Sequence, residues 1–274
     1  MILVFGRSGQ VAIELSKLKD VLCIGRKILN LEDAHRCIDM INLHQPTAVI
    51  NAAAYTSVDQ AEDEEALAHK INSIAPAAMA RACKELDIPF VHISTDYVFD
   101  GKKGSPYNEE DTTSPLNVYG ASKLKGEQYV QEICQAYYIL RTSWLYSQYG
   151  HNFYNTVLRF AKEGKLLTVT TEQMGTPTNA NDLAEAILTI IKLNKEKYGI
   201  YNFSNQGEAT WYDFAKEILI QTNQLTKSNL VKTDYYRTFA ARPKYSVLNT
   251  IKYNTAFVNL VIDWKSSLKS VIIK

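Results

Sequence analysis

Short apolar runs alternate with helical patterns through the first half of the chain. Continuous apolar runs occupy residues 2–5, 21–24, 48–50, 90–93 and 138–140. Runs of three to five apolar residues without alternation are typical of strands that are buried on both faces. Between them, apolar residues recur at helical spacing, first at Val11, Leu15 and Leu18 and then at Ala34, Cys37, Ile38 and Ile41. This alternation predicts an α/β fold with a Rossmann-type, doubly wound parallel sheet.

A further helical pattern precedes the fourth predicted strand. It places Leu67, Ile71, Ile74 and Ala78 on one face. Pro76 lies inside this pattern and has no amide hydrogen to donate. The segment is therefore expected to contain a kink or a new helix start.

The pattern of predicted elements changes after about residue 146. Loops lengthen, and single strands are predicted at residues 166–169 and 199–203. Thr210 and Asp213 have capping-box spacing and predict the start of a helix that contains Phe214 and Ile218. We expect a smaller mixed α/β substrate domain at the C-terminal side, joined without a flexible tether. The predicted division assigns residues 1–146 plus about 182–205 to a dinucleotide-binding domain, and about 147–181 plus 206–274 to a substrate-binding domain.

Composition narrows the possible partners. The 274 residues include 30 Lys and Arg against 29 Asp and Glu, a net charge of +1, which gives no general electrostatic attraction for nucleic acid or an anionic membrane. The 46% hydrophobic content excludes a largely disordered chain. No apolar window approaches the length of a membrane span, and the N-terminus lacks a secretory pattern. We expect a cytoplasmic protein.

Cysteines and histidines give no sign of a metal site. The four cysteines, Cys23, Cys37, Cys83 and Cys134, lie far apart and form no CxxC pair. They are expected to be reduced thiols. The five histidines show no metal-ligand spacing. No metal ligand is assigned from these residues.

A glycine pair follows the first predicted strand directly. Gly6, Gly9 and Ala12 form the pattern G-x-x-G-x-x-A, a relative of the dinucleotide fingerprint. Gly6 suits a tight turn, Gly9 lets the backbone approach a pyrophosphate, and Ala12 permits close helix–strand packing. The position between a strand and a helix predicts a cofactor phosphate loop.

The end of the second predicted strand bears on the choice of cofactor. Arg26 lies there, about 20 residues after Gly6, where NAD-dependent enzymes usually have a carboxylate. A guanidinium group pairs well with a 2′-phosphate, so Arg26 favours NADPH, with NADH as a possible substitute. A solvated basic turn remains the alternative interpretation.

One tyrosine–lysine pair has the spacing of a proton-donating site. Tyr119 and Lys123 are one helical turn apart, so both side chains can lie on one face. A nearby ammonium group is expected to lower the pKa of the phenol toward the working pH, which would suit proton donation to a carbonyl oxygen that receives hydride. Tyr212 and Lys216 have the same spacing but lie far from the glycine loop, and we interpret that pair as incidental.

Polar residues end two of the predicted strands. Ser94 and Thr95 follow the fourth strand, at the edge where open α/β sheets bind ligands. A hydroxyl group there can stabilise negative charge on a substrate oxygen; ordinary strand-end capping is the alternative. The small residues 52–54 after the third strand leave room for a cofactor.

Taken together, these motifs carry a resemblance. Residues 6–10, 51–54, 94–99, 114–120, 141–144 and 242–243 match in order, and on them the chain resembles the dTDP-4-dehydrorhamnose reductase family of extended short-chain dehydrogenases/reductases. The resemblance spans essentially the whole chain. It implies NADPH-dependent reduction of the C4 keto group of dTDP-4-dehydro-L-rhamnose to dTDP-L-rhamnose, a precursor of cell-surface polysaccharide.

The resemblance also implies roles for individual residues. Tyr119 would protonate the sugar C4 oxygen, Thr95 would polarise it, and Lys123 would hold the nicotinamide ribose. The implied cofactor contacts are Gly6, Gly9, Gln10, Val11, Arg26, Ala53, Ala54, Tyr55, Thr56, Ser94, Tyr119 and Lys123. The implied substrate contacts are Thr95, Asp96, Tyr119, Trp144 and Arg242. A core position for Trp144 and a surface ion pair for Arg242 are the alternatives.

One departure from the family pattern and two rival functions stay open. Some relatives bind Mg²⁺ at a dimer interface; Glu14 suits the first ligand position, but Asn181 stands where an acid is wanted, with Asp182 beside it. Metal-dependent dimerisation is therefore doubtful, and a monomer or a homodimer is expected. One rival is another extended short-chain nucleotide-sugar reductase or epimerase. The other is a non-catalytic NADP-binding regulatory subunit similar to that of methionine adenosyltransferase.

Overall fold

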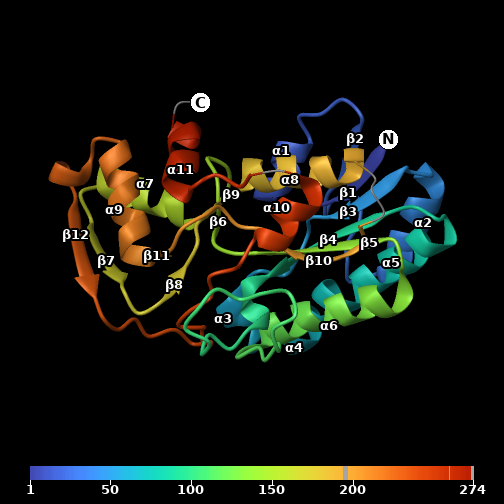
Figure 1. The fold of residues 1–274 in the computed structure, drawn as a ribbon, viewed down its shortest axis with the longest axis horizontal. Coiled ribbons are helices and arrows are strands. Elements are labelled where there is room, and N and C mark those ends of the chain that lie inside the picture. The colour runs from blue at the N-terminus through green and yellow to red at the C-terminus, as the bar shows by residue number, and fades with distance from the viewer. Residues whose placement is uncertain (194–196, 259, 273–274) are drawn as a thin grey trace.

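Six parallel strands form the central sheet of the protein (Figure 1). The computed structural model describes residues 1–193, 197–258 and 260–272. The strand order is β10-β5-β4-β3-β1-β2, and each neighbouring pair is parallel. The strands are β1 (Ile2–Phe5), β2 (Val21–Ile24), β3 (Ala48–Asn51), β4 (Phe90–Thr95), β5 (Tyr137–Thr142) and β10 (Gly199–Asn202). The predicted doubly wound sheet is confirmed, and its direction of winding reverses between β1 and β3, where such sheets bind ligands.

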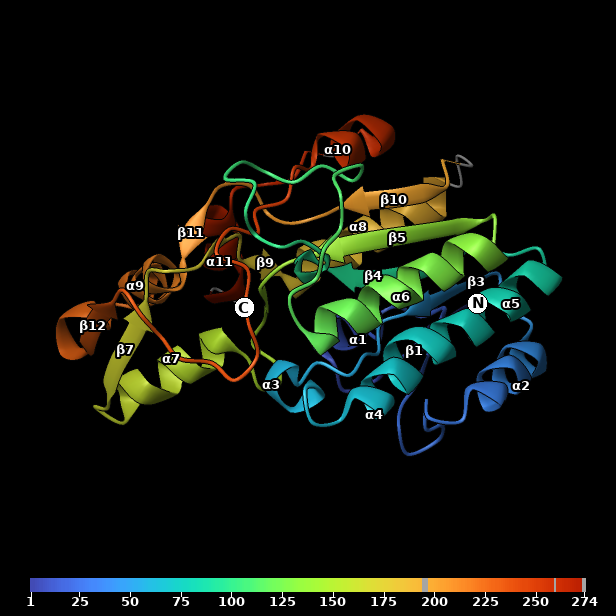
Figure 2. The same cartoon turned by 90° about the horizontal axis from the view of Figure 1, so that it is seen from below.

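Helices cover both faces of this sheet, as Figures 1 and 2 show from two sides. One apolar core joins the sheet to α1 (Gln10–Leu15), α8 (Ala180–Leu193) and α10 (Ile251–Phe257). The other joins it to α2 (Ala34–His44), α5 (Ala75–Glu85) and α6 (Val118–Ile133). Strands buried on both faces are mostly apolar, which explains the apolar runs in the sequence.

The first helix is shorter than its apolar spacing predicts. α1 ends at Leu15, and its core-facing residues are Val11, Ala12 and Leu15. Leu18 lies beyond the helix and is 38% exposed, so its assignment to the buried face is wrong. The chain turns after Leu15 to reach β2, and the amide of Leu18 donates to the Leu15 carbonyl within that turn.

The helical segment before β4 changes register at its centre. α4 (Glu65–His69) continues through a π-helical turn at Lys70–Ile74 into α5. The extra residue of the π turn rotates the following side chains, so that Ile74 is 47% exposed and Asn72 is buried. The predicted apolar face is therefore wrong at Ile74. The predicted new start near Pro76 is confirmed, because Pro76 occupies the first turn of α5.

The C-terminal side has a separate apolar core. Buried side chains of α7 (Phe153–Lys162), β7 (Leu166–Thr170), α9 (Trp211–Gln221) and α11 (Trp264–Ile272) form it. β7 pairs in parallel with β12 (Asn229–Thr233) at the far left of Figure 1. Two short strand pairs complete this region: β6 (Leu145–Tyr146) with β9 (Thr178–Asn179), and β8 (Met174–Gly175) with β11 (Ala209–Thr210). The short helix α3 (Val58–Ala61) contacts it through Asp59, which accepts from Ala240 and Arg242.

The start of α9 follows the sequence prediction closely. The Thr210 hydroxyl accepts from the Asp213 amide at 3.1 Å, and the Asp213 carboxylate accepts from the Thr210 amide at 3.0 Å. The predicted capping box is confirmed, and it fixes where Trp211 enters the helix. The predicted division of the chain into two domains stays a prediction.

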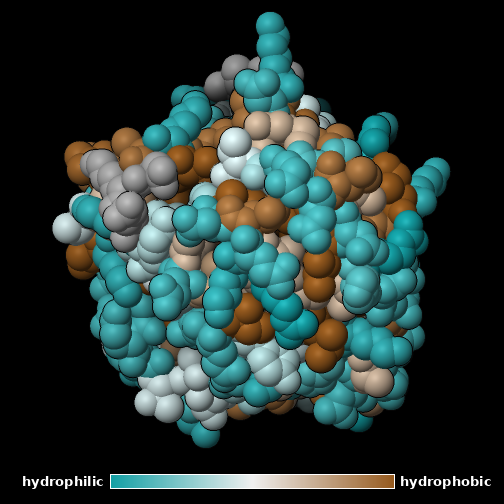
Figure 3. Space-filling model, turned by 90° about the vertical axis from the view of Figure 1, so that its right-hand side faces the viewer, coloured by the Kyte–Doolittle hydropathy of each residue, from teal (hydrophilic) through white to brown (hydrophobic). Residues whose placement is uncertain are grey.

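The surface and the thiols add little further chemistry. Hydrophilic residues cover most of the face at the N-terminal ends of the sheet strands, with hydrophobic residues scattered among them (Figure 3). Within the described residues, no helix combines the length and the apolar character that a membrane span requires. All four cysteines are buried free thiols.

Candidate active site

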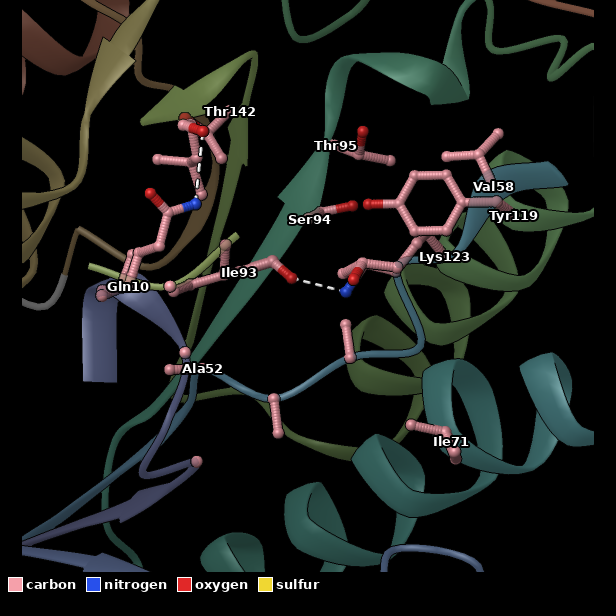
Figure 4. A pocket seen from close by; sticks show the side chains of 18 of the residues that line it. Gln10, Ala52, Val58, Ile71, Ile93, Ser94, Thr95, Tyr119, Lys123 and Thr142 are labelled. Carbon is pink, nitrogen blue, oxygen red and sulfur yellow. Dashed lines mark hydrogen bonds between the residues drawn. The ribbon is translucent and has the colours of Figure 1, made fainter. Parts of the chain in front are cut away.

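A cleft of about 640 Å³ opens at the carboxyl ends of the sheet strands (Figure 4). Its walls come from the glycine turn after β1, the ends of β3 and β4, the first turns of α6 and the loop after β5. The C-terminal region contributes Trp211 and Arg242. The predicted residues that line the cleft are Gly6, Gly9, Gln10, Val11, Arg26, Ala53, Ala54, Thr56, Ser94, Thr95, Asp96, Tyr119, Lys123, Trp144 and Arg242.

The glycine turn lies close against the end of β3. Gly6 has a φ of +125°, and a Cβ added there would be 3.2 Å from the backbone carbon and oxygen of Ala52. A side chain would thus meet both conformational strain and a contact with rigid backbone. Gly9 faces the same Ala52 oxygen at 3.8 Å from an added Cβ. This arrangement leaves backbone at the cleft surface, as a bound pyrophosphate requires.

Gln10 connects this turn to the C-terminal side of the cleft. Its side-chain amide donates to the Leu145 carbonyl at 3.3 Å, and its oxygen accepts from Ser147 and Asn152, each at 2.9 Å. The polar end of Gln10 is therefore already used within the protein. Any phosphate contact from this residue would come from its backbone.

Two guanidinium groups border the cofactor end of the cleft. The Arg26 side chain is 80% exposed and lies 3.7 Å from Glu32. Arg7, inside the glycine turn, also lines the cleft. It packs against Gly25, since a Cβ added to Gly25 would be 2.9 Å from the Cβ of Arg7. Both arginine side chains are exposed at the cleft. The sequence argument considered Arg26 and missed Arg7.

Tyr55 behaves differently from its neighbours after β3. Ala53, Ala54 and Thr56 line the cleft, whereas Tyr55 is absent from the lining among the described residues. Its hydroxyl donates to Glu64 at 2.7 Å, and its amide donates to Asn72 at 2.9 Å. The Tyr55 phenol is therefore held by Glu64 outside the described cleft lining, and a place for Tyr55 beside the cofactor ribose stays a prediction.

Tyr119 lies in the first turn of α6, whose N-terminus is capped by Asn117. The Asn117 side chain accepts from the Gly120 amide at 2.7 Å. Gly120 brings α6 close to the loop after β4, since an added Cβ would be 2.3 Å from the Tyr97 carbonyl oxygen. The rings of Tyr119 and Tyr97 meet edge to face with centroids 5.8 Å apart. These contacts fix the phenol over the cleft, as Figure 4 shows.

The pKa of Tyr119 departs from the sequence expectation. Burial raises the pKa of the phenol to about 12; Asp96 adds to the rise, and a hydrogen bond with Thr95 opposes it. The expected lowering by Lys123 is wrong for the protein without ligands, because desolvation of the phenolate is the largest effect. The phenol therefore keeps its proton at neutral pH, which is the state that a proton donor needs.

Lys123 is almost fully buried beneath Tyr119. Its Nζ donates to the Ile93 carbonyl at 2.6 Å and lies 3.3 Å from Nε2 of His92. Figure 4 shows the amino group and the Tyr119 hydroxyl on the same side of the cleft. Burial lowers the pKa of Lys123 to about 8, and the attraction of Glu127 opposes this shift.

A buried ion pair lies behind Ser94. Glu127, one turn after Lys123 on α6, pairs with Arg141 of β5 through Nη2 at 2.7 Å and Nε at 3.0 Å. The Ser94 hydroxyl donates to the same carboxylate at 2.5 Å. Ser94 thus lines the cleft while its hydroxyl group points to Glu127, and this pairing secures α6 to the strand ends.

Thr95 and Asp96 form the floor of the cleft. The Thr95 hydroxyl accepts from the Tyr97 amide at 3.2 Å and lies 3.1 Å from Asp96 Oδ1. Burial raises the pKa of Asp96 to about 7, against hydrogen bonds from Ser246 and Thr95. A hydroxyl beside a carboxyl with a raised pKa suits a site that binds a carbonyl oxygen.

Two indole rings form the wall opposite the glycine turn. Trp144 and Trp211 stack with centroids 3.6 Å apart and planes 7° apart. Trp144 has a φ of +45°, and Gly175 of β8 leaves space for its ring, since an added Cβ would be 2.5 Å from the indole. Trp211 Nε1 donates to Gln173 at 2.9 Å. Trp144 therefore lines the cleft, as expected, within a pair that the sequence argument did not anticipate.

Arg242 combines the two roles considered from the sequence. It lines the cleft, and its Nη2 donates to Asp59 of α3 at 3.0 Å. Asp59 also accepts from the Ala240 amide at 3.0 Å. The ion pair ties the C-terminal region to the sheet side at the mouth of the cleft.

The two weak metal candidates each have partners within the protein. Glu14 pairs with Lys17, and Asp182 accepts from Asn205 at 2.6 Å and Ser267 at 2.5 Å. In the part of the chain that the structure describes, no group of three or more His, Cys, Asp or Glu side chains could hold a metal ion.

The sequence argument missed Arg7 and Trp211 in the cleft lining and His92 behind Lys123. Arg7 occupies a variable position of the glycine pattern, where any residue is tolerated. The position of Trp211 in the sequence indicates only the start of a helix. His92 stands inside an apolar strand run, which reads as core. The only signal for it was a polar residue at the centre of a strand expected to be buried on both faces.

Comparison with known proteins finds relatives along the whole chain. The family model described as the RmlD substrate binding domain matches residues 1–274. The chain is 39% identical to the dTDP-4-dehydrorhamnose reductase of Escherichia coli (strain K12), over 99% of this chain and 96% of that protein. It is 40% identical to the spore coat polysaccharide biosynthesis protein SpsK of Bacillus subtilis (strain 168), over 90% and 88% respectively.

A solved structure extends the likeness to the fold. The crystal structure of dTDP-4-dehydrorhamnose reductase from Bacillus anthracis in complex with NADP matches with a TM-score of 0.95 at 35% identity. The match covers 99% of this chain and 98% of that one. It includes both the central sheet and the C-terminal region.

Proposed function

Because the chain belongs to the RmlD substrate-binding domain family, we propose that it is an NADPH-dependent oxidoreductase that makes dTDP-L-rhamnose. The reaction is reduction of the C4 keto group of dTDP-4-dehydro-L-rhamnose. Its product is the rhamnose precursor for cell-surface polysaccharide. The observation that carries the proposal is the convergence of the glycine turn, Tyr119 and Lys123 on one cleft.

The residues of the cleft fit the cofactor. Backbone without side chains at Gly6 and Gly9 faces the place for a pyrophosphate. Arg26 and Arg7 stand where a 2′-phosphate would need cations, and no carboxylate of the described cleft lining replaces them at the end of β2. NADPH, when bound, supplies the hydride that adds to the C4 carbon of the sugar.

The protein's own residues then supply one proton to the sugar. The Tyr119 phenol donates its proton to the C4 oxygen as that oxygen gains negative charge, so ketone and hydride become a secondary alcohol. Thr95 turns its hydroxyl hydrogen from Asp96 to the same oxygen and stabilises the developing charge. Lys123 holds the ribose hydroxyl groups beside the nicotinamide and supplies positive charge beneath the phenol.

The opposite wall suits the nucleotide sugar. Trp144, backed by Trp211, offers a flat apolar face on which a sugar or base stacks. Arg242 at the mouth provides a guanidinium group for the diphosphate, in exchange for part of its pairing with Asp59. Asp96 contacts the sugar hydroxyls on the floor.

The remaining assignments follow from this activity. The dinucleotide-binding part comprises residues 1–146 plus about 182–205, and the substrate part about 147–181 plus 206–274. We propose a cytoplasmic enzyme, a monomer or a homodimer, that needs no Mg²⁺. Treatment with a metal chelator leaves its turnover unchanged under this proposal.

The test is a stoichiometric assay with the purified protein. NADPH and dTDP-4-dehydro-L-rhamnose are mixed with it, nicotinamide absorbance is followed, and the product is identified by NMR. One NADPH consumed for each dTDP-L-rhamnose formed supports the proposal. Epimerisation without net NADPH consumption would establish the epimerase alternative. Absence of turnover together with a stoichiometric enzyme partner in a pull-down would establish the regulatory-subunit alternative.

A further inference from the structure

A row of buried polar side chains lies behind Lys123. His92, in the centre of β4, is fully buried, and its Nε2 lies 3.3 Å from Lys123 Nζ. On the other side of the ring, Nδ1 lies 3.1 Å from the side-chain nitrogen of Asn51, the last residue of β3. Within the described residues, neither His92 nor Asn51 lines the cleft. Both would therefore act only through Lys123.

The backbone fixes the orientation of the Asn51 amide. Its oxygen accepts from the Ala53 amide at 3.2 Å. A backbone N–H can only donate, so the oxygen must face it and the NH₂ group must face His92. Nδ1 of His92 is then the acceptor. A neutral imidazole has one hydrogen, which must sit on Nε2 and point at Lys123.

This arrangement distinguishes the two charge states of Lys123. An uncharged amine has a lone pair that accepts from Nε2–H. An ammonium group has none, so it requires Nε2 as an acceptor. The ring hydrogen must then move to Nδ1, and Asn51 must turn its oxygen toward Nδ1, which leaves the Ala53 amide without its acceptor. The ring stays neutral in both states, and the net uptake is one proton at Nζ.

We propose that Asn51 and His92 are positioning residues for Lys123, coupling the charge of its amino group to the tautomer of the His92 ring and so setting the upper pH limit of the reaction. The activity part of this inference rests on the proposed function. The coupling itself does not, because it concerns the protein alone.

The charged and titratable neighbours agree with a neutral ring. Tyr119 and Glu127 face Lys123 from α6, and Arg141 of β5 reaches the same place but is paired with Glu127. Burial, with repulsion from Lys123, lowers the pKa of His92 well below its usual range. No carboxylate contacts the His92 ring among its described hydrogen-bond partners. The ring therefore has nothing to stabilise a second proton, and only its tautomer is free to change.

The direct test is an NMR titration of the protein without cofactor or substrate. The chain contains five histidines, so ring-labelled ¹⁵N-histidine gives few signals, and His92 is assigned by their loss in His92→Gln. We expect a neutral His92 ring whose hydrogen moves from Nδ1 to Nε2 as the pH rises through about 8, where burial places the pKa of Lys123. A single tautomer over this range, or a ring that becomes doubly protonated, overturns the proposal.

The second test is the pH profile of turnover in Asn51→Asp. A carboxylate accepts from both Ala53 N–H and Nδ1–H, which leaves Nε2 as an acceptor for the ammonium group. The basic limb of activity is expected to move up by about one pH unit or more. Asn117→Asp is the matched control, because it adds the same charge at the α6 cap, where Asp keeps the bond from the Gly120 amide and loses only the bond to the Ala241 carbonyl. A shift in Asn51→Asp that is no larger than in Asn117→Asp overturns the proposal. If Asn51→Asp does not fold, the titration of the unaltered protein decides.

Discussion

The two walls of the cleft are built in different ways. On the cofactor wall, the glycine turn and the ends of β1, β3 and β4 follow one another as the chain winds through the sheet, and backbone atoms form much of the surface. On the opposite wall, Trp144, Trp211 and Arg242 come from three distant segments, and side chains form the surface. Gln10 joins the two walls through Leu145, Ser147 and Asn152.

This difference separates what is general in the fold from what is specific in the enzyme. Strand ends and glycine turns position a dinucleotide in many α/β proteins. The paired indoles and the Arg242–Asp59 pair need long-range contacts that the C-terminal core must hold in place. We therefore expect changes on the first wall to act on NADPH, and changes on the second to act on the nucleotide sugar.

The largest effect on turnover is expected from a change to the proton donor, which acts between the two walls. Tyr119→Phe removes the proton donor and keeps the ring that packs on Tyr97. Turnover should fall about 100-fold or more, while the NADPH dissociation constant, measured by fluorescence titration, stays within about twofold. Tyr212→Phe is the matched control, since Tyr212 has the same spacing to a lysine outside the described cleft lining. Turnover near that of the unaltered protein in Tyr119→Phe would remove Tyr119 from the mechanism.

A charge change at the cofactor wall should alter cofactor choice alone. Arg26→Asp places a carboxylate where a 2′-phosphate is expected, so the ratio of NADPH to NADH affinity should drop by about tenfold or more. Lys27→Asp makes the same change in charge at the neighbouring exposed residue and is expected to have a much smaller effect. If both variants keep the original ratio, Arg7 is the remaining candidate, and Arg7→Ala measures its share.

Loss of the second indole should weaken sugar binding alone. Trp211→Ala removes the ring that stacks on Trp144 at 3.6 Å. The KM for the nucleotide sugar should rise by about tenfold, the order expected for losing one well-packed aromatic contact, with NADPH affinity kept. Trp211→Phe should recover part of the loss because it retains an aromatic face. An unchanged KM in Trp211→Ala would show that Trp144 needs no support.

The smallest expected effect is on the pH dependence of turnover. The lowered pKa of Lys123, about 8, means that the ammonium group is present below this pH and is lost above it. Turnover should therefore fall as the pH rises, to about a quarter of its plateau at pH 8.5 for a single group of this pKa. A profile of kcat between pH 6 and 9.5 measures it. A flat profile to pH 9.5 would show that the charge of Lys123 does not limit the reaction.

Much of the fold was accessible from the sequence because local physics determines it. Unbroken apolar runs identified the doubly buried strands, and the Thr210–Asp213 capping box marked the start of α9. The interior of the helical segment before β4 was predicted incorrectly, because the π-helical turn at Lys70–Ile74 shifts the buried face by one residue. That shift buries Asn72, which donates to Ser122 of α6 at 3.0 Å, a tertiary contact that periodicity does not reveal.

The candidate site could be predicted from the sequence to about the same extent as the fold. Tyr119, Lys123 and the glycine turn stand at recognisable spacings, and the cleft brings them together. The direction of the Tyr119 pKa was predicted incorrectly, because it depends on how completely α6 and the β4 loop exclude water. The partner of the Tyr55 hydroxyl, Glu64, was not accessible from the sequence, because only the folded chain brings the two side chains together; the place of Tyr55 beside the ribose stays a prediction.

The most direct test of the account follows one hydrogen through the reaction. NADPH deuterated at the transferred position of nicotinamide C4 is mixed with dTDP-4-dehydro-L-rhamnose and the protein, and the product is analysed by NMR. The account predicts dTDP-L-rhamnose with one deuterium on the sugar C4 carbon and one NADPH oxidised for each product molecule. A product without deuterium at C4, or no ketone reduction at all, would contradict it.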